Sequence, residues 1–71
     1  MMTMADMITQ YREDAEKILL RLTMLKAEKA AALIAHDTHK ARALEKRIKV
    51  LDDEYIGLMA VVFELERKQR E

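Results

Sequence analysis

Apolar positions in the first half of the chain recur at alternating steps of three and four residues, the spacing of one stripe along a helix. This first stripe consists of Ile8, Tyr11, Ala15, Ile18, Leu22, Leu25, Lys29 and Ala32, with lysine as its one polar member. A second stripe consists of Ala41, Leu44, Ile48, Leu51, Tyr55, Leu58, Val62 and Leu65. The pattern predicts two long amphipathic helices.

The two stripes are out of phase by two residues, and the frame breaks between residues 33 and 40. Asp37 or Thr38 can accept a hydrogen bond from a free amide of a new helix, and His36 tolerates a left-handed helix stop. We therefore predict helices over about residues 4–35 and 38–69, with a turn at about 36–38. One unbroken helix is the alternative, because no glycine or proline enforces a stop there.

The stripes match each other when the chain is folded back at its midpoint. Leu25 then lies beside Ile48, Leu22 beside Leu51, and every other pair of stripe positions also sums to 73. Such matching is expected when two helices pack antiparallel across a short turn. The predicted fold class is all-α, an antiparallel two-helix hairpin resembling a coiled coil.

A single hairpin of this size needs another source of stability. The 71 residues include no cysteine, so neither a disulfide nor a thiolate metal site can support the fold. Further apolar residues lie off the stripes: Leu19, Leu20, Met24, Leu33 and Ile34 in the first half, and Ile56, Met59, Val61 and Phe63 in the second. We expect self-association into a four-helix bundle, with a homodimer favoured and a different helical protein as the alternative partner.

The stretch from Tyr55 to Leu65 is apolar nearly all round and would lie beside the methionines of the opposite chain end. The predicted interaction surface consists of Met4, Met7, Ile56, Met59 and Phe63. The first hypothesis for function is accordingly a non-enzymatic oligomerisation or protein-interaction module.

The charges balance at 13 basic and 13 acidic residues, but they are unevenly distributed. The tip half is basic, and its candidate phosphate contacts are Lys40, Arg42, Lys46, Arg47 and Lys49. These cations give the alternative function, a small nucleic-acid-binding regulator. An acidic waist consists of Glu13, Asp14, Glu16, Asp52, Asp53 and Glu54; its preferred interpretation is a charged surface that keeps the chain soluble, and electrostatic orientation of a partner is the alternative.

Other kinds of site have little support in the sequence. His36 and His39 flank Asp37 as a weak metal-ligand pattern, for which helix capping at an exposed turn is the preferred interpretation. No residues form a catalytic motif, so we predict neither an enzyme nor a cofactor or metal site. We expect no membrane span and no signal peptide, and therefore a cytoplasmic protein.

Overall fold

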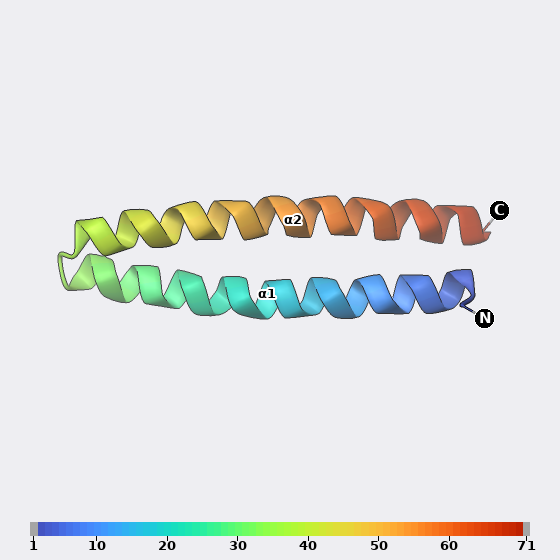
Figure 1. Cartoon of the computed structure of the whole chain (residues 1–71), viewed down its shortest axis with the longest axis horizontal. Coiled ribbons are helices and arrows are strands. Elements are labelled where there is room, and N and C mark those ends of the chain that lie inside the picture. Colours follow the sequence, from blue (N-terminus) through green and yellow to red (C-terminus); the bar gives the residue numbers. More distant parts are fainter. Residues whose placement is uncertain (1, 71) are drawn as a thin grey trace.

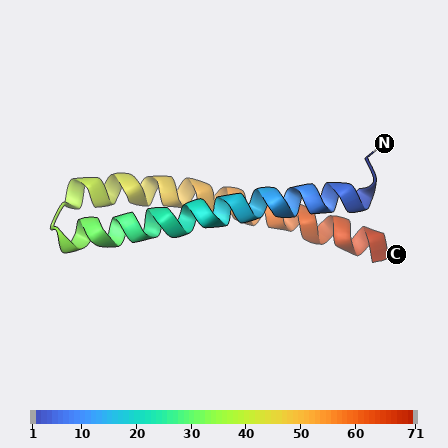
Figure 2. The same ribbon diagram turned by 90° about the horizontal axis from the view of Figure 1, so that it is seen from below.

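Two helices account for nearly all of the chain in the computed structural model, which describes residues 2–70. Helix α1 spans Met4–Ile34 and helix α2 spans Thr38–Arg70. They run antiparallel as a rod of 52 × 16 × 16 Å with both chain ends at one end (Figure 1). Viewed at a right angle, the helices cross near the middle of their lengths (Figure 2). The predicted all-α hairpin is confirmed, and the alternative of one unbroken helix is wrong.

Helix α1 begins at a capping box. The hydroxyl of Thr3 accepts a hydrogen bond from the amide of Asp6 at 3.1 Å, and the carboxylate of Asp6 accepts one from the amide of Thr3 at 3.1 Å. Two amides that lack partners within the helix are thereby satisfied. The periodicity of the apolar residues carried no information about this contact.

The turn is built from the two residues predicted to stop one helix and start the next. His36 adopts the left-handed conformation, with φ 59°. The amide of Asp37 donates to the carbonyl of Ala32 at 2.8 Å, and the amide of His36 donates to that of Leu33 at 3.1 Å, which together form a Schellman motif. The carboxylate of Asp37 then accepts from the amide of Lys40 at 3.1 Å and caps α2.

The core is the contact between the two stripes. Every stripe member is buried or half-buried, including Lys29, whose amine lies 3.5 Å from the Glu45 carboxylate. The most enclosed large side chains are Leu22 and Val62, at 2% and 0% exposure. Outside the stripes, the half-buried residues of the described chain are Met7, Met59 and Glu66. The core is therefore one residue layer deep.

Candidate interaction surfaces

The outer faces of the hairpin carry many large apolar side chains. Those exposed by 40% to 82% are Met2, Met4, Leu19, Leu20, Met24, Leu33, Ile34, Val50, Ile56, Val61 and Phe63. Within residues 2–70, the fully buried set is smaller and includes three alanines: Ile8, Ala15, Leu22, Leu25, Ala32, Ala41, Leu44 and Val62. More large apolar side chains thus face solvent than are fully buried, which is characteristic of a surface that binds another molecule.

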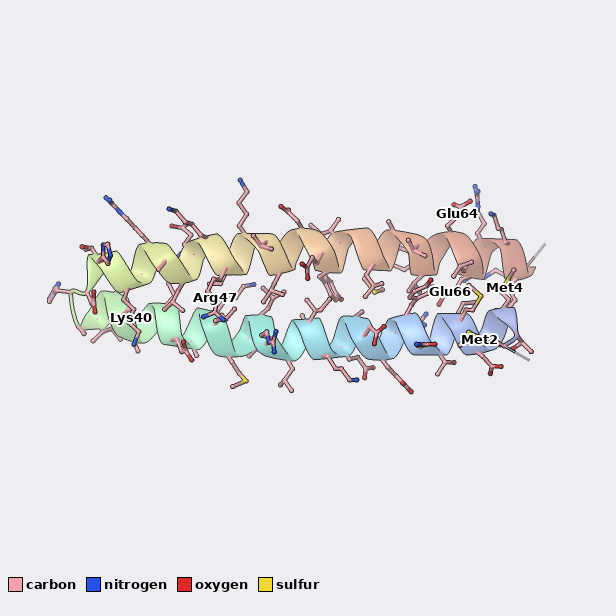
Figure 3. All side chains as sticks on the ribbon, viewed as in Figure 1. Met2, Met4, Lys40, Arg47, Glu64 and Glu66 are labelled. Carbon is pink, nitrogen blue, oxygen red and sulfur yellow. The ribbon has the colours of Figure 1, made fainter. Side chains whose placement is uncertain are left out.

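The structure divides the predicted interaction surface between two places. Ile56 and Phe63 are each 60% exposed and share one face of α2 with half-buried Met59, since they are separated by steps of three and four residues. Met4, 40% exposed, and half-buried Met7 lie in the first turns of α1. Figure 3 shows Met4 at the end of the rod that also holds the last turns of α2.

Leu19, which the sequence had not assigned to the interaction surface, joins the apolar face of α2. Its side chain and that of Met59 line one shallow groove together with Tyr55. Leu19 is 47% exposed, so the groove has an accessible apolar wall on both helices. The face centred on Met59 can therefore contact a partner through α1 and α2 simultaneously.

We call one flank of the hairpin the first edge. Along it, the numbers of the two residues that face each other across the helices add up to 78. It consists of Arg12, Leu19, Lys26 and Leu33 on α1, and Glu45, Asp52, Met59 and Glu66 on α2. Arg12 forms an ion pair with Glu66, and the register sets Lys26 opposite Asp52. Three levels of this edge therefore match opposite charges, or apolar side chains, within one molecule; at the fourth, Leu33 lies opposite Glu45, which pairs with Lys29 instead.

The second edge is the other flank, along which the numbers of the two facing residues add up to 68. It consists of Met7, Asp14, Arg21 and Glu28 on α1, and Lys40, Arg47, Glu54 and Val61 on α2. Arg47 extends from α2 toward α1 (Figure 3). It lines one groove together with Arg21, and Lys40 and Glu28 line another.

Asp14 and Glu54 occupy the next level of the second edge toward the chain ends. Each lies seven residues from an arginine of this edge, and two helical turns return a residue to the same face. The second edge thus contains a basic rung, Arg21 opposite Arg47, beside an acidic rung, Asp14 opposite Glu54. Among residues 2–70 the ion pairs are Arg12–Glu66, Lys29–Glu45 and Arg67–Glu64, and none uses either rung.

The five cations predicted as phosphate contacts are all exposed but do not share one face. Lys40 and Arg47 lie on the second edge, and Lys46 lines the groove of Arg47. Arg42 and Lys49, seven residues apart, share another side of α2. The structure brings Arg21 of α1 to this groove, which the sequence analysis missed. The register could have revealed this pairing, because the numbers 21 and 47 add up to 68, as they do for every facing pair of the second edge.

The turn residues make local contacts that explain their types. Asp37 caps α2 and His36 provides the left-handed stop, as described above. Within the described range of 2–70, no three histidine, aspartate or glutamate residues lie close enough together to hold a metal ion.

Neither α1 nor α2, as far as the structure describes them, is long and apolar enough to cross a membrane. Comparison of the chain with protein families, curated proteins and solved structures finds no match. The function is therefore inferred from the surface chemistry of the hairpin.

Proposed function

We propose that the protein is a non-enzymatic interaction module that associates through its exposed apolar faces into a helical bundle. The favoured partner is a second copy of the chain, which would give a four-helix bundle, and a different helical protein is the alternative. The supporting observation is that, among the described residues, the large apolar side chains exposed on the outer faces outnumber those that are fully buried.

The spacing of the exposed side chains favours a helical partner. Ile56 and Phe63 are two turns apart on α2, and Met59 lies between them on the same side. Residues three and four apart form the ridges that interdigitate when helices pack side by side. A rod only 16 Å wide also leaves most of each helix circumference accessible to another helix.

The most exposed aromatic residue of this surface provides the test. Phe63→Glu replaces a ring that is 60% exposed with a charge, so the hairpin core loses little while an apolar interface loses a contact and gains a buried carboxylate. We expect association to weaken at least tenfold, about 1.4 kcal/mol, with reduced helicity at the same concentration. Light scattering over a concentration series gives the mass, and circular dichroism of the same samples gives the helicity.

Gln10→Glu is the matched control, because it adds the same charge at an exposed polar position. It should leave mass and helicity at wild-type values. If Phe63→Glu also leaves both unchanged, and the wild-type hairpin is a fully helical monomer at every concentration, the proposed function is wrong.

A further inference from the structure

The two rungs of the second edge present a problem for the isolated hairpin. Arg21 lies opposite Arg47, and Asp14 lies opposite Glu54, so like charges face each other at two adjacent levels. Like charges at facing positions of packed helices disfavour the contact, and e and g positions flanking a seam normally select partners by charge. The two rungs thus destabilise the contact between α1 and α2 in the isolated hairpin.

The first edge shows that this arrangement is not a general feature of the chain. There Arg12 forms an ion pair with Glu66, and Lys26 faces Asp52 in the same register. The same two helices therefore set opposite charges facing each other at two levels of the first edge, while on the second edge they do so only at Glu28 and Lys40 and leave the two rungs unmatched. A partner that approaches the second edge with the opposite charges would resolve both rungs at once.

We propose that the second edge is the docking surface for a second copy of this chain, bound antiparallel about a two-fold axis between the two rungs. The inference rests on the proposed function and adds a second contact face, on the flank opposite the edge that holds Met59, together with its orientation and register. The rungs lie about 10 Å apart along the rod, the rise of seven helical residues. Rotation about an axis midway between them places Arg21 and Arg47 of each copy over Asp14 and Glu54 of the other, a self-complementary contact.

Apolar side chains lie at the centre of this edge. Val50 follows Arg47 by three residues and precedes Glu54 by four, so it lies at the level of the axis, and it is 58% exposed. Met24, 59% exposed, lines the groove of Arg21 and Arg47 from the α1 side. In this interface the apolar centre would supply burial, and the flanking rungs would fix register and orientation.

Paired charge reversals test the register. Arg21→Glu with Arg47→Glu makes both rungs acidic, and Asp14→Arg with Glu54→Arg makes both basic. Each double variant alone should associate on the order of 100-fold more weakly than the wild type, because every cross-copy contact becomes repulsive. An equimolar mixture should recover the wild-type mass by light scattering, since acidic rungs then face basic rungs. A decoy swap on the first edge, Lys26→Asp with Asp52→Lys, should leave the mass unchanged.

A disulfide cross-link tests the orientation. Because the sequence has no native cysteine, only the introduced cysteines can form a disulfide. Val50→Cys lies beside the proposed axis and should form a covalent dimer under mild oxidation. Ile34→Cys, at 82% exposure near the turn, is the control that should remain uncrosslinked at the same concentration. Circular dichroism of each variant confirms that the helices are retained.

The outcomes separate this inference from the proposed function. Charge-reversed variants that keep the wild-type mass, with no effect of mixing, would overturn the second-edge interface, while dissociation by Phe63→Glu would still support the interaction module. A poorly helical monomeric wild type at all concentrations would overturn the second-copy partner, leaving a different helical protein to be sought, and a fully helical monomer would overturn the proposed function as well. Loss of duplex RNA binding in Arg21→Glu with Arg47→Glu, at unchanged mass, would also overturn the inference and assign the cations to phosphate binding.

Discussion

Leu22→Ala should be among the most damaging truncations in the hairpin, because Leu22 is only 2% exposed at the contact between the stripes. Leucine-to-alanine changes in enclosed cores cost roughly 2–5 kcal/mol. Here the core is one layer deep and open on both flanks, so the helices can close around the lost volume, and we expect about 2.5 kcal/mol. This corresponds to a fall in Tm of roughly 10–20 °C for a domain of this size. Urea and thermal unfolding followed by circular dichroism measure the change.

Leu20→Ala is the matched control, two residues away on the same helix. Leu20 is 66% exposed, and alanine is as good a helix former as leucine, so the loss in the hairpin should be about 0.5 kcal/mol or less. Both variants should be measured under the same conditions, at a concentration below that at which the wild type associates. A cost under about 1 kcal/mol for Leu22→Ala, or equal costs for the two, would refute the placement of the core.

Two further predictions concern polar groups. Lys29→Leu should stabilise the hairpin by about 1 kcal/mol, because a leucine at this half-buried stripe position gains more free energy from burial than is lost with the weak ion pair to Glu45. A lower urea midpoint than that of the wild type would show that the ion pair dominates. The hydrogen bonds from the amide and hydroxyl of Thr3 lower the pKa of Asp6, so the capping box contributes stability above the ordinary aspartate pKa and loses it as the pH falls through the lowered value. Protection of the first-turn amides against exchange, relative to the intrinsic rate at each pH, should fall over that acid range, and an equally steep fall of protection in Asp6→Asn would contradict the assignment.

The apolar periodicity was sufficient to predict the helices, the break between them and their register. Steps of three and four residues identify the buried side of a helix directly, because only one side of each helix faces the other. The two-residue phase shift located the turn, and the chemistry of His36 and Asp37 indicated how the chain would stop and restart there. These features depend on local geometry and on the stripes, both of which are visible in the sequence.

The polar contacts were harder to predict for a physical reason. The capping box of Thr3 and Asp6 and the ion pair of Arg12 with Glu66 depend on rotamers of exposed side chains, which the apolar pattern does not constrain. The grouping of Arg21 with Arg47 depends on which flank each residue occupies after the helices pack. It follows from the same register as the core, but only once positions beside the stripes are paired as well as positions within them.

The short turn also determines how the chain finds its fold. Leu25, Ala32, Ala41 and Leu44 form a core cluster next to the turn, and only three residues separate α1 from α2. Contacts near a short connection close a small loop, so they form with the lowest entropic penalty, and each added turn of helix brings the next pair of stripe residues together. The hairpin should therefore zip from the turn toward the chain ends, where Met4 and Phe63 lie. The last segments to order therefore include the part of the predicted interaction surface formed by Met4 and Phe63.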